Sequence, residues 1–286
     1  MANLKEIRNR ITSIGSTMKI TKAMKMVSAA KLKKAQDAVA AIVPYSEKLS
    51  TIIQNLSDNS SLTSVSPFSK ERPIERALIV MITSNRGLCG ALNSNIIKRT
   101  KKIVHEEYKG KKVDILPIGK KGADGLDKGY DLLENENEIF DKLSYTNASK
   151  IADKLMDLYE QKNYDRIQLV YSSFKNAATQ IIKNEQYLPV AAPKQDKEAS
   201  TDYITEPTKK AIISELIPKA LKLELYKAIR DAFASEQGAR MTAMHKATDN
   251  ANELRESLLL KYNKARQAAI TNEILEIVGG AEALKA

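Results

Sequence analysis

The stretch MTAMHKATDNANELRESLLLKYNKARQAA, residues 241–269, decides the fold of this chain. Nine small or apolar side chains recur in it at steps of three or four residues, with an average step of 3.5. They are Met241, Met244, Thr248, Ala251, Leu254, Leu258, Tyr262, Ala265 and Ala269. A repeat of 3.5 residues is the seam of a left-handed coiled coil, because a mild supercoil keeps such a stripe against a partner helix. The stretch therefore predicts a long helix that packs along a second helix.

The other end of the chain supplies the predicted partner. Apolar residues follow steps of three and four over residues 4–18, and the same spacing returns over residues 28–56. Pro44 falls inside this second helix. It removes one backbone hydrogen bond and crowds the carbonyl of Ala40, so we expect a bend or a break there. Antiparallel pairing of the two helices would bury both weak stripes.

The carboxy-terminal helix is predicted to open at residues 206–208 (EPT), because proline is tolerated in the first turn of a helix. A second proline, Pro218, is expected to kink its start. From there the pattern allows an unbroken helix to about Val278, and the glycine pair at 279–280 is predicted to end or loosen it.

The middle of the chain changes to a pattern of strands and helices. Residues 77–83 (ALIVMIT) form a continuous apolar run, which is typical of a strand buried on both faces. The remaining segments are predicted as a helix at 91–108, a strand at 113–118, a weaker segment near 130–133, a helix at 147–162 capped by Asn147, and a hairpin of strands at 167–171 and 179–189. Strands that alternate with helices predict an open, mainly parallel α/β sheet covered on both sides.

We therefore predict an α/β fold in which a Rossmann-like open α/β domain is inserted between the helices of a long antiparallel coiled coil. The predicted parts are an amino-terminal helix at 1–57, a loop at 58–75, the α/β domain at 76–193, a loop at 194–206 and a carboxy-terminal helix at 207–286. The first loop carries two prolines and many serines, which marks a boundary.

Two glycine-containing segments stand out in the middle of the chain. Gly119, Gly122 and Gly125 follow a strand, but their spacing matches neither GxGxxG nor GxxxxGK, so we interpret them as glycines that free a tight turn. The segment SNRGLCGALN, residues 84–93, is more distinctive. In it Ser84 or Asn85 could cap a helix, Gly87 and Gly90 permit a close turn, and Cys89 is predicted to be a small buried side chain.

No catalytic centre is visible in the sequence, and we expect no metal, no cofactor and no catalytic residue. His105 and His245 lack neighbours with metal-ligand spacing. The single cysteine excludes an internal disulfide and favours a reducing compartment. No apolar run approaches the roughly 20 residues of a membrane span, and the start lacks a secretory signal. We expect a cytoplasmic chain that could work beside a membrane.

The charge of the chain is strongly positive. Its formal net charge is +11, and ten Lys or Arg stand against three acidic residues within residues 1–50. Six of them crowd into four turns, namely Lys19, Lys22, Lys25, Lys31, Lys33 and Lys34. A lysine-rich helix usually presents a solvated face, but this density favours an acidic counterpart. A basic balance suits nucleic acid, an anionic membrane or an acidic protein, and does not choose among them.

Three segments resemble the gamma subunit of F-type ATP synthases. They are KITKAMKMVSAAKLKKA (19–35), SNRGLCGALN (84–93), and EQGARMTAMHKATDNANEL continuing through YNKARQAAITNEILEIVGGAEAL (236–284). Since they lie at the start, middle and end of the chain, the resemblance covers essentially its whole length. Asn85 departs from the family, which usually has Asp at this position.

The resemblance implies the central rotor shaft of the enzyme, which couples proton translocation to ATP synthesis or hydrolysis by rotation. Its coiled coil would stand inside a ring of catalytic (beta) and non-catalytic (alpha) subunits. Its α/β domain would sit on the epsilon subunit and the c-subunit ring. The expected location is peripheral, at the cytoplasmic face of a bacterial inner membrane.

The resemblance also assigns contact residues near the two ends of the chain. Met24 and Lys25 match a contact to an acidic loop of a catalytic subunit. A polar set matches a contact to another loop of that subunit and the helix beside it: Arg266, Gln267, Thr271 and Glu273. An apolar tip would turn inside an apolar sleeve: Ile270, Ile274, Ile277 and Val278. On the residues alone, ordinary seam packing is the favoured interpretation of Met24, and an ordinary surface charge is that of Arg266.

Two other functions stay open on the residues alone. A coiled-coil scaffold or adaptor without a motor role shares every feature, and co-purification with a nucleotide-hydrolysing hexamer would distinguish the rotor from it. A basic nucleic-acid binder is disfavoured, because the helices lack interleaved aromatic residues and no nucleic-acid motif is present. Steep salt-dependent affinity for DNA would favour that binder.

Overall fold

The structure, a computed structural model, describes residues 4–56, 66–126, 129–177, 179–190, 205–206 and 208–283. The chain divides into two compact units, which we call the helical unit (Met1–Ser28 with Met241–Ala286) and the sheet unit (Ala29–Arg240). Two long helices, α1 (Leu4–Leu56) and α6 (Lys209–Ala283), contribute to both units. The expectations for residues 58–65, 191–204 and Pro207 lie outside the described residues.

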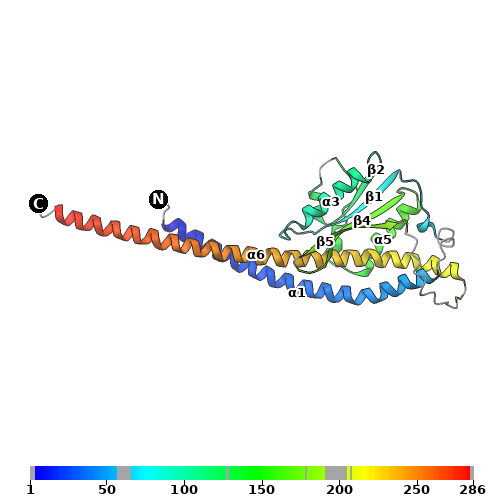
Figure 1. The fold of residues 1–286 in the computed structure, drawn as a ribbon, viewed down its shortest axis with the longest axis horizontal. Coiled ribbons are helices and arrows are strands. Elements are labelled where there is room, and N and C mark those ends of the chain that lie inside the picture. The colour runs from blue at the N-terminus through cyan, green and yellow to red at the C-terminus, as the bar shows by residue number, and fades with distance from the viewer. Residues whose placement is uncertain are drawn as a thin grey trace. The chain divides into compact units, whose positions relative to one another are not determined.

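In the helical unit, α1 and α6 run side by side in opposite directions (Figure 1). Buried and half-buried side chains recur on each helix in alternating steps of three and four. They include Leu4, Ile7, Ile11, Ile14, Met18, Thr21, Lys25 and Ser28 on α1, and Met244, Thr248, Ala251, Arg255, Leu258, Tyr262, Ala265 and Ala269 on α6. The hydroxyl oxygens of Thr21 and Thr248 lie 2.8 Å apart across the seam. The predicted antiparallel coiled coil is confirmed.

One predicted seam position is wrong. Leu254 is 52% exposed, and Arg255 is half-buried in its place. Both positions keep the average step at 3.5 residues, so the average step does not distinguish Leu254 from Arg255. The regular alternation of steps of four and three after Ala251 selects residue 255. An arginine fits there because its aliphatic stem can lie along an apolar stripe while its guanidinium reaches water.

The long helices are more continuous than the sequence predicts. α1 continues through Pro44, so the expected break is wrong. Burial of Leu49 and Leu56 beyond it helps to offset the hydrogen bond that proline removes. α6 ends at Ala283, beyond the glycine pair at 279–280, because glycine lowers helix stability by only about 1 kcal/mol relative to alanine.

The described part of the sheet unit contains a five-stranded sheet. Its strands are β1 (Arg76–Ile82), β2 (Lys112–Ile118), β3 (Asp131–Leu132), β4 (Arg166–Phe174) and β5 (Gln180–Leu188). The strand order is β3-β2-β1-β4-β5. β1 pairs in parallel with β2 and β4, β2 pairs in parallel with β3, and β5 pairs antiparallel with β4. The predicted mainly parallel α/β sheet and its terminal hairpin are confirmed.

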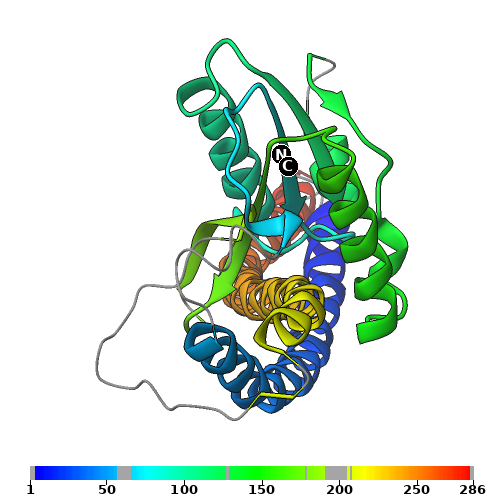
Figure 2. The same cartoon turned by 90° about the vertical axis from the view of Figure 1, so that its right-hand side faces the viewer.

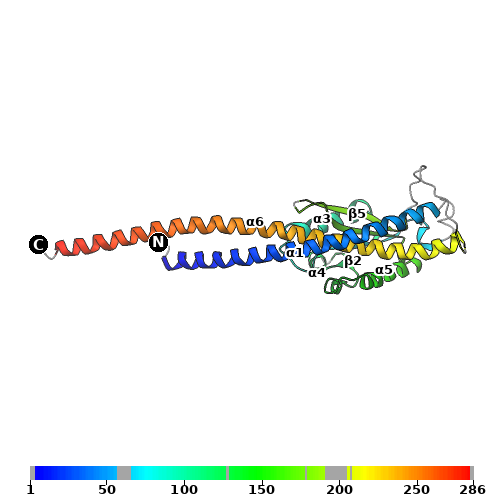
Figure 3. The same ribbon diagram turned by 90° about the horizontal axis from the view of Figure 1, so that it is seen from below.

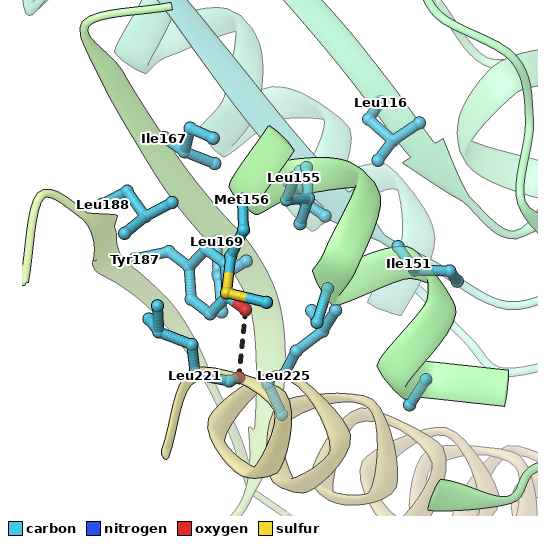
Figure 4. Packing of buried hydrophobic residues seen from close by; sticks show 14 of the residues in the cluster. Leu116, Ile151, Leu155, Met156, Ile167, Leu169, Tyr187, Leu188, Leu221 and Leu225 are labelled. Carbon is cyan, nitrogen blue, oxygen red and sulfur yellow. Dashed lines mark hydrogen bonds between the residues drawn. The ribbon is translucent and has the colours of Figure 1, made fainter. Parts of the chain in front are cut away.

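Helices cover both faces of this sheet (Figure 2). On one face, α3 (Leu92–Glu106) contributes Ile96 and Ile103 to a buried cluster with β1. On the other face, α5 (Tyr145–Glu160) and the sheet-unit part of α6 share a larger cluster with the strands. Figure 4 shows this cluster, in which the hydroxyl of Tyr187 donates a hydrogen bond of 3.0 Å to the carbonyl of Leu221. α6 is therefore part of the core of the sheet unit.

Short helices occupy several connections, namely η1 (Pro67–Ser69), α4 (Lys120–Asp124) and η2 (Asn137–Phe140). The cap of α5 differs from the prediction. Ser144 caps this helix by accepting a hydrogen bond of 3.3 Å from the amide of Asn147. The Asn147 side chain donates instead to the carbonyl of Lys142. Asn147 is three residues too late to be the cap, since a cap accepts from the second or third helical amide.

The glycines after β2 serve close packing, in agreement with their interpretation as turn residues. Gly119 has a φ of +113°, and a Cβ at this position would lie 2.3 Å from the carbonyl oxygen of Thr83. The amide of Gly122 donates a hydrogen bond of 2.9 Å to the hydroxyl of Thr83. The loop after β2 is therefore tied to the end of β1.

Candidate functional site

The carboxy-terminal end of α6 presents an apolar surface. Within the helical unit, α6 extends past the start of α1 (Figure 3), and its described side chains from residue 270 to residue 281 are all exposed. The apolar row consists of Ile270 (47% exposed), Ile274 (54%), Ile277 (71%) and Val278 (53%). Steps of four and three place these residues on one side of the helix. An exposed apolar row of this kind is typical of a surface that another protein covers.

The polar set lies beside the apolar row. Arg266, Gln267, Thr271 and Glu273 are exposed on the same end of α6. The hydroxyl of Thr271 donates a hydrogen bond of 2.9 Å to the carbonyl of Gln267 one turn earlier. Leu275, which the sequence analysis did not single out, adjoins this surface and is 63% exposed.

Met24 and Lys25 lie on α1 in the helical unit, and both are half-buried. Three apolar neighbours that the sequence analysis missed are more exposed, namely Ile20 (60%), Met26 (61%) and Val27 (55%). A search for a buried stripe passes over apolar residues that fall outside the stripe. The sequence did carry a signal: residues 19–35 contain more apolar side chains than there are seam positions to bury them.

In the sheet unit, α6 contacts the end of the sheet at which open α/β sheets usually bind a ligand. Such ligands bind beyond the carboxyl ends of the strands, where the strand order reverses. Here that point lies between β1 and β4. The hydroxyl oxygens of Ser235 on α6 and Ser172 on β4 lie 2.7 Å apart, and Arg240 of α6 binds the loop after β1. α6 therefore covers part of this end of the sheet.

Arg240 and Glu236 form a buried ion pair, which we call the Arg240 clamp. Nη1 of Arg240 lies 2.6 Å from Oε1 of Glu236, and each side chain is 9% exposed. Nη2 of Arg240 donates to the carbonyl oxygens of Arg86 and Gly87 at 3.0 and 3.1 Å. Burial raises the pKa of the Glu236 carboxyl, and the neighbouring Arg240 guanidinium opposes this shift. The sequence analysis missed this pair, although its spacing of four residues was a signal.

Side-chain hydrogen bonds hold the segment SNRGLCGALN, both within the segment and to residues further along the chain. Cys89 is buried, as predicted, at 2% exposure. Ser84 donates its amide to Oδ1 of Asn93. Asn85 accepts a hydrogen bond of 3.0 Å from the amide of Lys120, and its Nδ2 donates to the carbonyl of Asn137 at 2.9 Å.

Neither Ser84 nor Asn85 therefore caps α3, and that expectation is wrong. The side-chain oxygen of Asn85 instead accepts a hydrogen bond from the amide of Lys120, the first residue of α4. An aspartate at this position could accept from the Lys120 amide in the same way. It could not donate to the Asn137 carbonyl when ionised, so this contact depends on the carboxamide.

The two histidines lie in different surroundings. Nδ1 of His245 is 3.2 Å from a carboxylate oxygen of Asp249, and Nε2 of His105 is 3.3 Å from the hydroxyl of Tyr130. Within the described ranges, no group of three or more His, Cys, Asp or Glu side chains is placed to hold a metal ion. None of the helices described here has an apolar stretch long enough to cross a membrane.

The fold defines a class of protein, in which two long terminal helices pair as a coiled coil and an open α/β domain is inserted between them in the sequence. The family model described as ATP synthase matches residues 3–284. The chain belongs to the ATP synthase gamma chain family.

Individual relatives agree with this assignment. The ATP synthase gamma chain of Flavobacterium psychrophilum is 62% identical over all of both chains. That of Christiangramia forsetii is 59% identical over 99% of both chains. A cryo-EM structure of the central stalk and c-ring of Tetrahymena thermophila mitochondrial ATP synthase matches with a TM-score of 0.59 and 26% identity, covering 80% of this chain and 99% of that one. The rotor of the Euglena gracilis mitochondrial ATP synthase matches in fold, with a TM-score of 0.65 and 21% identity over 93% of this chain and 98% of that one.

Proposed function

We propose that this chain is the central-stalk rotor subunit of a bacterial ATP synthase, coupling proton translocation to ATP synthesis or hydrolysis by rotation. The observation that carries the proposal is the apolar row on the end of α6, which is fully helical and exposed. A coiled-coil adaptor would not need a long, unpaired helix end whose apolar side chains face water. A shaft that turns inside a protein sleeve does need one.

The proposed work is mechanical, and the chain supplies no catalytic residue to it. The shaft must favour different conformations in chemically identical subunits by presenting a different side to each. Driving one two-state switch almost to completion requires about 5.5 kcal/mol of differential contact energy. One proton crossing 100 mV supplies about 2.3 kcal/mol, so several protons must contribute to each step.

The contact residues divide by chemistry. Met24 and Lys25 would meet an acidic loop of a catalytic subunit, where the ammonium of Lys25 attracts carboxylates without fixing one geometry. Arg266 and Gln267 would make a polar contact to another loop of that subunit, with Thr271 and Glu273 beside them. The apolar row would turn inside the sleeve. Half-burial of Met24 and Lys25 supports this proposal, because part of each side chain stays available to a partner.

The proposed partners are the alpha and beta subunits around the coiled coil, with the epsilon subunit and the c-subunit ring against the sheet unit. The central stalk of the Tetrahymena enzyme was determined together with its c-ring, which supports this arrangement. The chain would then be peripheral to the cytoplasmic face of the bacterial inner membrane. No nucleic acid takes part.

Reconstitution tests the rotor directly. The full chain is combined with purified alpha, beta and Cys-tagged epsilon subunits. A bead is attached through epsilon, and rotation is observed during ATP hydrolysis. We expect stepwise rotation in one direction. A hexamer that hydrolyses ATP with the chain bound but stationary would support the adaptor instead.

Met24→Lys tests the contact on α1. The variant adds a cation beside the proposed acidic loop, so we expect assembly to survive while proton flow becomes uncoupled from synthesis. The measurement is ATP-driven proton pumping in membranes alongside ATPase activity. Gln36→Lys, which adds the same charge at an exposed position of α1, is the control. Normal pumping by Met24→Lys would contradict the contact.

Arg266→Ala tests the polar set. Loss of the guanidinium should weaken torque transfer or assembly, and we expect reduced ATPase activity in the reconstituted complex. Lys264→Ala removes a cation two residues away, also exposed on α6, and should leave activity unchanged. Equal activities of the two variants would remove the assignment of Arg266.

A further inference from the structure

The sheet ends in a long strand that is paired on one side. β5 is the last strand in the order β3-β2-β1-β4-β5, and it pairs with β4. Apart from this ladder, the described residues make no backbone hydrogen bond to Gln180–Leu188. The strand at the opposite edge, β3, has only two residues. Of the two described edges, β5 therefore offers the longer row of backbone donors and acceptors to another strand.

Most of β5 is regular. From Gln180 to Gln186 it follows β4 residue by residue, and the register irregularity falls beyond this stretch, between Ile167 and Gln168 of β4. Proteins commonly protect an edge strand by keeping it short, by bending it with a bulge or by placing proline in it. Neither a bulge nor a proline interrupts the stretch from Gln180 to Gln186. Its backbone is therefore suited to pairing with a further strand.

The centre of β5 carries two opposite charges on either side of Asn184. Side chains two residues apart in a strand lie on one face of the sheet, and Nζ of Lys183 is 3.2 Å from Oε1 of Glu185. These two side chains are 42% and 39% exposed, so a partner can reach both. A lone lysine would repel a second copy of the same strand. A lysine and a glutamate placed symmetrically about a central residue complement each other when the strand is reversed.

We propose that β5 pairs antiparallel with β5 of a second copy of this chain, about a two-fold axis at Asn184. In this register Lys183 of each copy lies opposite Glu185 of the other. An axis at Lys183 would place lysine opposite lysine, and an axis at Glu185 would place glutamate opposite glutamate. Opposite charges across an antiparallel pair are stabilising and like charges are destabilising, so the charges select the register centred on Asn184.

This dimer has the two-fold symmetry that is commonest among oligomers, and it joins the two sheets into one. One pair of strands makes a small interface, so we expect a weak dimer. The pairing uses neither the apolar row nor the polar set. It concerns the chain outside the enzyme and does not depend on the rotor function, so a failure of either proposal leaves the other untouched.

Sedimentation velocity of the full chain tests the self-association. Protein concentration is varied from about 1 µM to about 500 µM, and we expect a shift from monomer to dimer with a dissociation constant of about 10–100 µM. A chain that stays monomeric over the whole range would overturn the proposal.

Exchange of the two charges locates the interface. Lys183→Glu and Glu185→Lys each place like charges opposite one another, so each should weaken the dimer about tenfold or more. An equal mixture of the two variants should dimerise again, because both glutamates of one copy then face both lysines of the other. Lys98→Glu, at an exposed position of α3, changes the net charge as Lys183→Glu does and should dimerise as the wild type does. Folded variants that dimerise like the wild type, or whose mixture stays monomeric, would overturn the interface.

A measurement on the wild type covers variants that fail to fold. Amide hydrogen exchange is followed by mass spectrometry at about 1 µM and about 500 µM protein. We expect slower exchange at the higher concentration in the peptide that contains β5, while the peptide that contains β1 stays unchanged. A dimer whose β5 amides gain no protection would mean that the two copies meet elsewhere, which contradicts the proposal.

Discussion

Individual polar residues join parts of the chain that lie far apart in sequence. Arg240 reaches back to Arg86 and Gly87, and Ser235 pairs with Ser172. Each contact is buried, so each depends on a complete set of partners. Sequence analysis found the segment 84–93 by its glycines but could not find what holds it, because that partner is some 150 residues away.

The Arg240 clamp should contribute strongly to stability. Arg240→Ala leaves Glu236 buried without its partner and two carbonyls without a donor, so we expect a loss of about 3–5 kcal/mol in the free energy of unfolding. Replacing both residues, with Arg240→Met and Glu236→Leu, should cost less than Arg240→Ala alone. Urea unfolding followed by circular dichroism measures both variants. A loss below about 1 kcal/mol for Arg240→Ala would mean that the pair is not buried as described.

Helix α6 has three different surroundings along its length. Its first part belongs to the core of the sheet unit, a later part forms the seam with α1, and its end is exposed. Periodicity predicted the seam because packing against one partner requires a repeat of 3.5 residues. It could not decide between Leu254 and Arg255, since both fit that average.

Substitutions in the apolar row should separate folding from assembly. Ile274→Ser and Ile277→Ser replace side chains that are 54% and 71% exposed, so the stability of the isolated chain should change by less than about 0.5 kcal/mol. If the sleeve buries these residues, each loss should weaken binding to the alpha and beta subunits by about 1.5–3 kcal/mol, or roughly 10- to 100-fold.

Surface plasmon resonance measures that binding. Ile181→Ser is the matched control, because it removes an isoleucine that is 45% exposed on β5 of the sheet unit. It should leave affinity for the alpha and beta subunits unchanged. Equal effects of all three variants would show that the apolar row has no special role in assembly.

For the whole molecule, the dominant physical property is charge. The net charge is +11, and Lys19 and Lys22 are exposed on α1 in the helical unit. A positive surface accelerates encounter with an acidic partner by steering it over distances near the Debye length. Charge therefore acts on the rate of assembly more than on the final affinity.

Salt should slow the assembly of the chain with the alpha and beta subunits. Raising ionic strength from about 0.1 M to about 1 M shortens the Debye length from about 10 Å to about 3 Å. We expect the association rate constant, measured by stopped-flow fluorescence, to fall at least tenfold while the dissociation rate changes little. The double variant Lys19→Gln with Lys22→Gln should show a shallower dependence. A rate independent of salt would contradict an acidic counterpart.

The sequence by itself determined the architecture: two terminal helices with a 3.5-residue stripe, and an alternation of strands and helices between them. These features are local, because the spacing of apolar residues follows from which side of a helix or strand is buried. The resemblance in three segments indicated the family and the contact residues on the helix ends, and those contacts stay predictions.

Only the tertiary structure decided which residues meet. It placed Arg255 in the seam, carried α1 through Pro44, brought α6 into contact with β4, and placed β5 at the edge of the sheet. Each of these outcomes depends on contacts between residues far apart in the chain. The spacing of apolar residues within one segment predicts which face of a helix or strand is buried. It does not predict which residues cover that face.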